Sequence, residues 1–488
     1  YSWRGADPNI ILNICAYYDI EKYFLNTNYR CGENIVKIAE TGIKHMPRRE
    51  AKQMVAHRPG GKIEILPASG PGLLQLSFDA LNHIKRELAR GVRPSEICVL
   101  ARNNSHVAIL GNLLLREGIY CTAAEDMKIS NLPLFKDLVN ILEMSKDTYN
   151  TNMVKTYLWK VVPFLGLKGG QAVYEFMQAT GCSLKNSLGY ILINYCHRQD
   201  INWSGKIKIS DRVDYKIEAM MDKVNFKAIN GLVEIYNILC SEDELERVSA
   251  FLYMFQEASG FLYGTLDRMR TLIGMTQYFK YMCTTYGIED THAFLRLTEQ
   301  YESGKMVVSG DTITLSTIHG AKGMEWRYVI QFADDNISFP SFEAIVKMLG
   351  KGISEKDINI MIDSERRLHY VAQTRAIEKW TLLADVTNIS VLALESLGIM
   401  QSYGGSVNND VIINLARRGG LNDTLIETIY MELRNESSPY AYSYRKEVLQ
   451  DALKNLSENS ELEGEEVEKE CSNNASVISE GTDSEDLT

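Results

Sequence analysis

Two arginines stand in short polar segments that are suited to binding phosphate. Arg30 lies in the segment NYRCGENI, and Arg375 lies in ERRLHYVAQTRA. A guanidinium stays charged at neutral pH and presents a rigid fork of donors to phosphate oxygens, which a lysine cannot copy. Arg375 has a second interpretation, because an arginine near the carboxyl end of a helix can merely satisfy carbonyl groups and the helix dipole. The two arginines are candidate phosphate ligands, with a helix-cap role open for Arg375.

A glycine-containing turn follows a predicted strand in the segment TLSTIHGAKGMEW. Gly320 and Gly323 let the backbone approach a phosphate of a nucleotide or of DNA, because no Cβ is in the way. His319 and Glu325 flank this turn and are candidate ligand-binding residues. The alternative is that His319 caps the strand and that Glu325 pairs with Lys322 on the surface.

The segment YSWRGAD contains an aromatic residue beside a basic one, Trp3 and Arg4. This pair fits single-strand binding, because stacking a base on an aromatic face gains about 1–3 kcal/mol and every base has such a face. A lone tryptophan is more often a core anchor, so burial of Trp3 is the alternative.

The segment GLKGG at residues 166–170 precedes a predicted helix. It has two interpretations: a hairpin whose amides hold duplex phosphate, and a plain helix–helix turn. The turn is favoured.

The printed sequence contains no phosphate-binding loop of the form GxxxxGK[ST], in which backbone amides hold the phosphates and a hydroxyl holds magnesium. Every Gly-Lys pair is followed by another residue type: Ile63, Ile207, Met306 or Gly352. Asp334 and Asp335 follow an apolar strand, as magnesium-binding acids do in enzymes that contain this phosphate-binding loop. Without the loop, we expect them to be loop residues near DNA or solvated side chains.

Strand and helix patterns alternate on both sides of a helical middle section. Strands are predicted at residues 62–66, 97–100, 313–318, 328–332 and 380–384, and helices at 33–40 (after a turn at Cys31 and Gly32), 71–90, 106–117 and 364–375. The continuously apolar run ICVL at 97–100 is typical of a strand covered on both faces. Residues 126–299 are mostly helical, with helices at 233–239 and 250–261. We therefore predict an α/β domain with a parallel sheet, interrupted by a helical insertion.

The net charge of −11 is concentrated at one end of the chain. Residues 455–488 hold eleven acidic side chains and one basic, Lys469, which leaves the remainder almost neutral. Overall acidity therefore does not exclude a nucleic-acid partner, since phosphate contacts depend on local basic patches. The last residues, rich in Ser, Asn and Glu, predict a disordered tail.

No apolar run approaches the roughly 20 residues of a membrane span, so we expect no membrane partner. The nine cysteines show no CxxC pair and predict neither disulfides nor a structural metal, as expected in a reducing cytoplasm. The sequence starts at Tyr1 without a methionine, which led us to expect a piece of a longer chain.

The segments YSWRGAD, NYRCGENI, TLSTIHGAKGMEW and ERRLHYVAQTRA together resemble motifs III, IV, V and VI of the UvrD/Rep-type superfamily 1 DNA helicases. They occur in the family's order, with an insertion between motifs IV and V, and the resemblance covers residues 1–395. It implies RecA-like domains of the P-loop NTPase type, hydrolysis of ATP with Mg²⁺ in the cleft between two of them, and 3′ to 5′ movement on single-stranded DNA.

The resemblance also implies roles for individual residues. Those facing the nucleotide are Arg30 and Arg375 at the γ-phosphate, Tyr29 at the adenine, and Glu325, with Gly323 beside it, at the ribose. Those facing DNA are Trp3, Arg4, His319 and, as a phosphate contact, Arg102. Three residues depart from the usual motifs: Gly320 replaces Ala or Ser, Met324 replaces Leu, and Gln373 occupies a normally apolar position.

The predicted organisation follows from the resemblance and the patterns together. It is a remnant of a first RecA-like domain at 1–22, a second RecA-like domain at 23–125 and 300–395, a helical insertion at 126–299, a helical extension at 396–440 and a disordered acidic tail at 441–488. The phosphate loop and the magnesium ligands would lie in an upstream part.

The expected activity is that of a cytoplasmic DNA-repair helicase acting on single-stranded DNA and single-strand/duplex junctions, with a tail that is a candidate binding segment for a protein partner. One alternative is a non-catalytic DNA-binding or regulatory module. A less favoured one is a helicase–nuclease, suggested by Asp214, Tyr215 and Lys216, whose order matches a nuclease motif but which lie inside the insertion.

Overall fold

The computed structural model describes isolated residues near the amino terminus and most of the chain from residue 20 to residue 418. The described residues are 10, 13, 14, 17, 18 and 20–418, with gaps at 48, 51, 71, 200–221, 243–246, 248–249, 252–253, 255–265, 288–290, 306–310, 386 and 399–407. Trp3, Arg4, the predicted nuclease-like residues 214–216, most of the predicted helix 250–261 and the acidic tail lie outside them.

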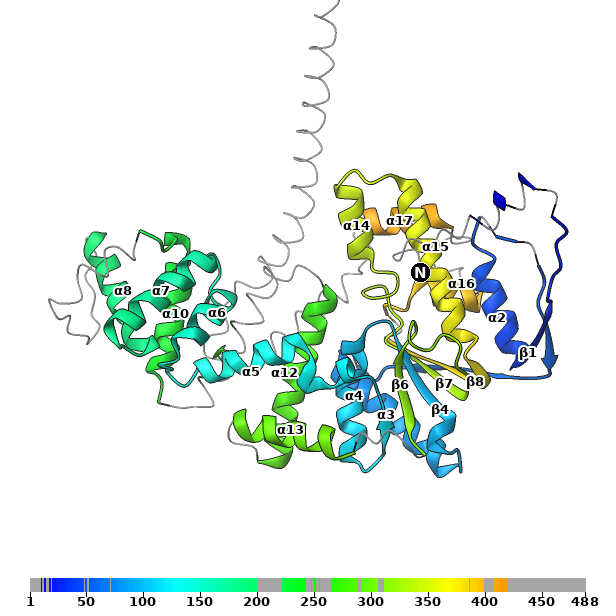
Figure 1. Cartoon of the computed structure of the whole chain (residues 1–488), viewed down its shortest axis with the longest axis horizontal. Helices are drawn as coiled ribbons and strands as arrows, with labels where there is room; N and C mark the ends of the chain where they lie inside the picture. Colours follow the sequence, from blue (N-terminus) through cyan, green and yellow to red (C-terminus); the bar gives the residue numbers. More distant parts are fainter. Residues whose placement is uncertain are drawn as a thin grey trace, which may run out of the picture.

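A six-stranded parallel sheet forms the centre of the molecule (Figure 1). In sheet order the strands are β3 (Lys62–Pro67), β8 (Ala376–Ala384), β7 (Trp326–Phe332), β4 (Ile97–Ala101), β6 (Ile313–Thr317) and β5 (Cys121–Thr122). All five predicted strands are present, although β7 and β8 begin earlier than predicted. The predicted α/β class with a parallel sheet is confirmed.

Helices cover both faces of this sheet, as the apolar run in β4 predicts. Ile97 and Val99 pack into one core with α3 (Leu73–Ala89) and α4 (Asn104–Arg116). Cys98 and Leu100 pack into the other core with α2 (Glu33–Ile43), α15 (Glu355–Gln373) and α16 (Val391–Leu397). Because successive strand side chains point to opposite faces, four consecutive apolar residues require two apolar layers.

A second, two-stranded parallel sheet precedes the main one and was not predicted. β1 (Thr27–Gly32) pairs with β2 (Val55–Arg58), so the turn predicted at Cys31 and Gly32 is wrong: both residues end a strand. A Cβ on Gly32 would lie 2.7 Å from the Cα of Gly61. Glycine is therefore needed because two backbones approach closely, which its local sequence context does not reveal.

The described residues of the insertion between β5 and β6 form helices joined by turns, with no strand among them. α6 (Thr151–Val161), α7 (Gly166–Thr180), α8 (Leu184–Arg198) and α10 (Ile229–Cys240) form the group at the left of Figure 1, and α5 (Pro133–Met144) lies between this group and the helices nearer the sheet. α12 (Leu266–Tyr286) and α13 (Thr291–Lys305) return the chain to α3 and α4. The short helices are η2 (Pro94–Glu96), η3 (Glu125–Met127), η4 (Ile129–Asn131) and η5 (Phe226–Ala228).

Two further helices complete the described fold, and both pack near the predicted motif VI helix. They are α14 (Phe342–Gly350) and α17 (Asn409–Arg417). α15 itself is longer than predicted: Ser354 caps its start by accepting a hydrogen bond from the Asp357 amide, and Glu355 adds a favourable charge to the first turn. None of the helices described is both long and apolar enough to cross a membrane.

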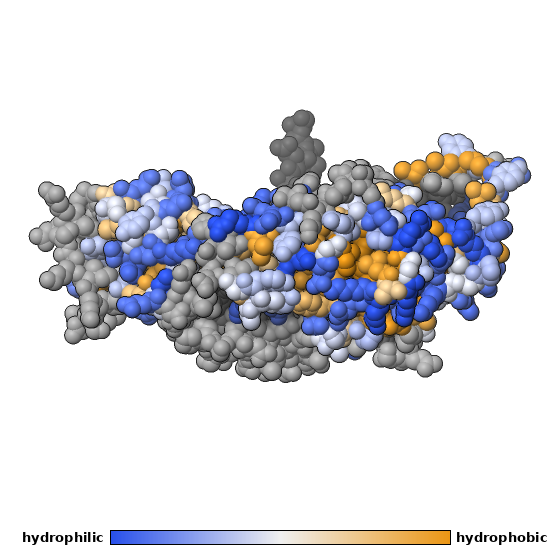
Figure 2. Space-filling view, turned by 90° about the horizontal axis from the view of Figure 1, so that it is seen from below, coloured by the Kyte–Doolittle hydropathy of each residue, from blue (hydrophilic) through white to orange (hydrophobic). Residues whose placement is uncertain are grey.

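The end of the molecule near β1 exposes large apolar side chains (Figure 2). Leu25 is 87% exposed, Tyr23 82% and Tyr29 67%, and Ile20 and Phe24 are also exposed. Large exposed apolar side chains gathered in one segment are typical of a face that another domain or partner covers.

Candidate functional site

Two neighbouring strands and β1 bring Arg30, Arg375 and Glu325 together. Glu325 and Arg375 immediately precede β7 and β8, whose first residues pair in register, and the Trp326 amide donates to the Arg375 carbonyl at 3.0 Å. Arg30 lies near the end of β1. Residues separated by about 300 positions in the sequence thus meet at the amino-terminal edge of the main sheet.

Arg30 is bonded to the residue predicted to hold the ribose. Its Nε donates to Glu325 Oε2 at 2.5 Å and its Nη1 donates to the Thr374 carbonyl at 3.2 Å. Both side chains of the ion pair remain partly exposed, Arg30 at 31% and Glu325 at 49%. The alternative pairing of Glu325 with Lys322 is replaced by this longer-range one, and a ligand can reach both groups.

Arg375 is more buried and is tied to backbone carbonyls. Its Nε donates to the Val371 carbonyl and its Nη1 to the Met324 carbonyl, each at 3.0 Å. Burial, and then the like charge of Arg30, lower the pKa of Arg375. The helix-cap alternative is thus present in part, because Val371 belongs to α15, while the side chain also joins α15 to the turn before β7.

Tyr29 and Gly323 lie beside these charges with space around them. Tyr29 is 67% exposed, and its ring centroid lies 5.0 Å from that of His57, with the two rings tilted by 37°. The Arg58 Nε donates to the Tyr29 carbonyl at 3.0 Å, which holds the backbone of β1 against β2. Gly323 has φ +89° and no atom within 4 Å of a hypothetical Cβ. The exposed ring offers a stacking face, and the glycine leaves the turn open.

Two of the predicted DNA-facing residues, Arg102 and His319, lie at the opposite edge of the sheet, while Trp3 and Arg4 lie outside the described residues. Arg102 and His319 follow the carboxyl ends of β4 and β6, which are adjacent strands. The Arg102 guanidinium binds Glu365 of α15 through two hydrogen bonds of 3.0 Å. His319 is exposed; partial burial and then the charge of Arg102 lower its pKa, against the opposing effect of Glu365. The structure therefore separates the two predicted groups by the length of the strands.

Asp334 and Asp335 follow β7 in a loop, as predicted, but the expectation of solvated side chains is wrong, because both residues are buried. Asp335 forms an ion pair with Arg270 of α12, and Asp334 Oδ2 accepts from Gln331 at 2.7 Å and lies 2.9 Å from His369 Nε2. These acids join the end of β7 to the insertion and to α15. They are structural groups rather than solvated side chains.

The candidate metal ligands among the described residues surround a lysine. Glu64, His83 and Glu87 could hold an ion, but Lys379 Nζ lies 2.5 Å from Glu64 Oε2 and 3.1 Å from Glu87 Oε1. Burial and the charge of Lys379 lower the pKa of His83 to about 4. The ammonium group already supplies the cation that the carboxylates require.

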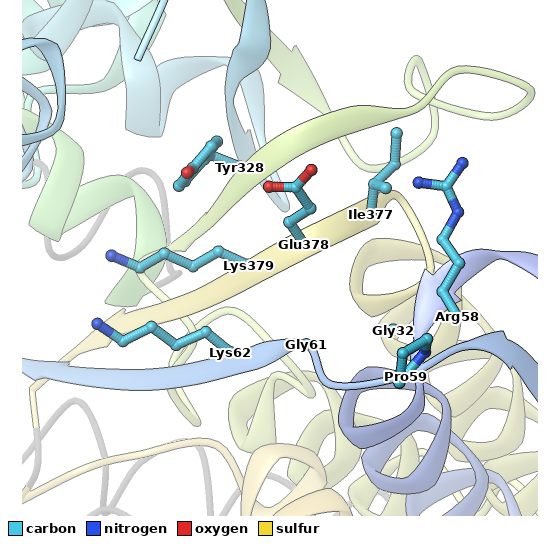
Figure 3. Close-up of a pocket in the computed structure, with 9 residues that line it drawn as sticks. All are labelled: Gly32, Arg58, Pro59, Gly61, Lys62, Tyr328, Ile377, Glu378 and Lys379. Atoms are coloured by element: carbon cyan, nitrogen blue, oxygen red, sulfur yellow. The ribbon is translucent and has the colours of Figure 1, made fainter. Parts of the chain in front are cut away.

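A pocket of about 670 Å³ (Figure 3) lies beside the arginine cluster, which consists of Arg30 and Arg375. Lys62 and Lys379 extend in the same direction from β3 and β8, and Arg58 stands at the other end. The remaining lining residues are Gly32, Pro59, Gly61, Tyr328, Ile377 and Glu378. None of the predicted nucleotide-facing residues lines it.

The segment GLKGG forms the first turn of α7, directly after the connection from α6. α7 begins at Gly166, while Gly169 and Gly170 are buried against Leu165 and Trp159. The helix–helix turn lies at residues 162–165, immediately before the segment for which it was predicted. Gln373, the departure from motif VI, is fully buried, and neither of its side-chain polar atoms has a hydrogen-bond partner.

The structure is thus a parallel α/β domain with a helical insertion between its strands and two arginines at one edge of the sheet. The chain belongs to the family of the UvrD-like helicase C-terminal domain, whose sequence model matches residues 23–384. The resemblance to UvrD/Rep-type helicases is thereby confirmed for this portion.

Curated relatives carry helicase names. The chain is similar to a Staphylococcus epidermidis protein named ATP-dependent DNA helicase PcrA, at 24% identity over 405 residues, which is 78% of this chain and 49% of that protein. It is also similar to the probable DNA helicase II homolog of Mycoplasma capricolum, at 24% over 392 residues, covering 77% and 48%. The chain spans about half the length of the curated relatives it matches.

Proposed function

We propose that this chain is the carboxy-terminal part of an ATP-dependent DNA helicase that moves 3′ to 5′ on single-stranded DNA. The observation that carries the proposal is the gathering of Arg30, Arg375 and Glu325 at one edge of the sheet, in a chain that belongs to a helicase family. The direction of movement rests on the resemblance alone.

The donor set fits ATP better than it fits magnesium. Two guanidinium groups suit the phosphates, the exposed Tyr29 ring suits the adenine, and Glu325 suits the ribose hydroxyls. Glu325 is the one carboxylate among these four residues, whereas Mg²⁺ takes several oxygen ligands. We therefore assign the magnesium ligands and the phosphate-binding loop to an upstream segment of the kind that the longer relatives have room for. Magnesium bound there would neutralise charge on the transferred phosphoryl group.

The arginines act by position and charge. In phosphoryl transfer the protein mainly places groups around developing negative charge, and an arginine from a second domain couples domain closure to that charge. Turning the Nε side of the Arg30 guanidinium toward a phosphate would open its bond to Glu325 and free Glu325 for the ribose at the same time. Nucleotide binding would thus break the ion pair between Arg30 and Glu325 and replace it by one contact of each side chain with the nucleotide.

Single-stranded DNA would bind at the opposite edge, where His319 and Arg102 lie, with Trp3 and Arg4 adding stacking and charge. Single-strand/duplex junctions are the proposed substrate. The assignments to DNA repair and to the cytoplasm remain proposals from the resemblance, as does a protein partner for the tail.

The rival proposal is a non-catalytic DNA-binding module, and ATP turnover separates the two. We expect the protein of residues 1–488 alone to show no DNA-stimulated ATP hydrolysis. The protein extended by its upstream coding sequence should hydrolyse ATP faster when single-stranded DNA is added. Phosphate release measured with and without oligo-dT tests both. Turnover absent from the extended protein, with DNA binding intact, would favour the rival.

Replacing Tyr29 by alanine should raise KM for ATP in the extended protein by roughly five- to a hundredfold, the equivalent of losing a stacked base at about 1–3 kcal/mol. Tyr29→Phe is the matched control, because it keeps the ring and should keep KM. Single-strand affinity without nucleotide should not change, since Tyr29 lies at the far edge from His319. Steady-state kinetics and fluorescence anisotropy measure the two quantities; a loss of DNA affinity with unchanged KM would contradict the assignment.

A further inference from the structure

Arg102 is already bound by a carboxylate whose geometry resembles that of a phosphate. Glu365 receives the Nε and Nη2 donors of Arg102 on its two oxygens, each at 3.0 Å. A guanidinium binds phosphate through the same pair of parallel donors, so one ligand can replace the other without moving the arginine far. Sequence reasoning missed Glu365, although it is the first residue of the motif VI segment.

The pair is accessible at the sheet edge where DNA is proposed to bind. The Arg102 side chain is 27% exposed and the Glu365 side chain 14%. His319 is exposed, and both residues affect its pKa: besides partial burial, the charge of Arg102 lowers it, and the charge of Glu365 raises it. A phosphate arriving beside His319 would therefore meet an arginine that is partly exposed and a carboxylate that repels it.

Glu365 also connects this edge to the opposite one. It lies within α15, which ends at Gln373, directly before Thr374 and Arg375. From Glu365 to Gln373 the helix rises about 12 Å, at 1.5 Å per residue. Thr374 accepts a bond from Arg30 through its carbonyl, and Arg375 is bonded to α15 through Val371. One rigid helix thus carries the partner of Arg102 at one site and the arginine cluster at its end.

We propose that Glu365 is a positioning residue that holds Arg102 until a phosphate of single-stranded DNA replaces it. When DNA binds, the exchange releases α15 from the end of β4. DNA binding is thereby coupled to the helix that ends beside Arg375. The inference rests on the proposed function, because it needs a nucleic-acid strand at this edge.

The test is the salt dependence of DNA binding by the whole chain. Fluorescein-labelled oligo-dT is titrated with wild type and with Glu365→Gln at several salt concentrations, and anisotropy gives the affinity. Removing the competing charge should raise affinity about two- to fivefold, the usual scale of a partly exposed ion pair. Because Arg102 then binds phosphate more fully, the slope of log affinity against log salt should steepen by as much as about 0.7, the value for one single-strand phosphate.

Two further variants make the result specific. In an Arg102→Ala background, Glu365→Gln should no longer change either affinity or slope. Glu378→Gln is the matched control: it removes a carboxylate from a similar two-bond pair with Arg327, at 2.9 and 2.7 Å, at the other edge of the sheet. It corrects for the loss of one negative charge. Thermal melting confirms that each variant is folded.

The outcomes separate the inference from the function on which it rests. A steeper slope that disappears with Arg102→Ala supports the exchange. An unchanged slope for Glu365→Gln, or an equal gain for Glu378→Gln, overturns the exchange and leaves DNA binding standing. Absence of DNA binding by the wild-type chain overturns the proposed function and the exchange together.

Discussion

Replacing Arg375 by alanine in the protein extended by its upstream part is expected to lower kcat for ATP hydrolysis by about a thousandfold or more. Removing an arginine that stabilises the charge of phosphoryl transfer has an effect of this size. Arg375 lies beside Arg30 at the edge where Glu325 is half exposed, and its guanidinium is held by carbonyls from two elements. Single-turnover and steady-state phosphate release measure the loss.

Controls must separate lost chemistry from lost structure, because Arg375 is 9% exposed and joins α15 to the turn before β7. Arg375→Lys keeps the charge but not the fork of donors, so it should recover only part of the rate. Arg86→Ala changes an exposed arginine of α3 and should leave kcat within about a factor of two, as surface substitutions usually do.

Single-strand affinity without nucleotide and the thermal midpoint complete the comparison. The affinity should remain close to wild type in Arg375→Ala, because His319 and Arg102 lie at the other edge. The thermal midpoint should fall moderately, because the Val371 and Met324 carbonyls lose their donor. A normal kcat would return Arg375 to the role of a helix cap. A large fall in thermal midpoint together with lost DNA binding would show that Arg375 mainly holds the fold.

The local sequence predicts the strands of the main sheet well and the small sheet not at all. The run at 97–100 is apolar on every residue, and its neighbours β6 and β7 confirm a strand covered on both faces. Gly32 looks like a turn residue. Glycine is needed there, however, because the backbone of Gly61, which is remote in sequence, lies too close for a Cβ. A glycine selected by a distant backbone cannot be distinguished from a turn glycine by its neighbours.

The candidate residues were identified from short motifs, whereas their partners were not. Arg30 and Glu325 are 295 positions apart, and Arg102 and Glu365 are 263 positions apart. Local patterns carry no information on such pairings, so the sequence led us to consider Lys322 for Glu325 and solvent for Asp335. The same reason hides Arg270, whose charge makes the burial of Asp335 tolerable.

Motif VI contains a further arginine whose importance is structural. Arg366 is 3% exposed; its Nε and Nη2 donate to Glu395 at 2.8 and 2.6 Å, and its Nη1 donates to Asp363 at 2.8 Å and also bonds Asn409. Burial opposes its charge, but Glu395 and Asp363 outweigh that effect and raise the pKa of Arg366. The side chain thereby ties α15 to α16 and α17.

Replacing Arg366 by methionine should lower the free energy of unfolding by about 3–5 kcal/mol, because Glu395 is left as a buried charge without its partner. Burial already raises the pKa of Glu395, and loss of Arg366 should raise it further. A carboxyl with a raised pKa in the folded protein stabilises it below the pKa of the unfolded state, and this contribution is lost as pH rises. The defect should therefore be larger at pH 7 than near pH 5.

Urea unfolding followed by circular dichroism measures this, with Arg417→Met as the matched control. Arg417 pairs with Glu355 where both side chains are about half exposed, so its loss should cost at most about 1 kcal/mol. Adding Glu395→Leu to Arg366→Met should restore much of the stability, because replacing both partners of a buried pair by apolar groups removes the uncompensated charge. A double variant that is no more stable than Arg366→Met would mean that Asp363 and Asn409, rather than Glu395, account for the contribution of this arginine.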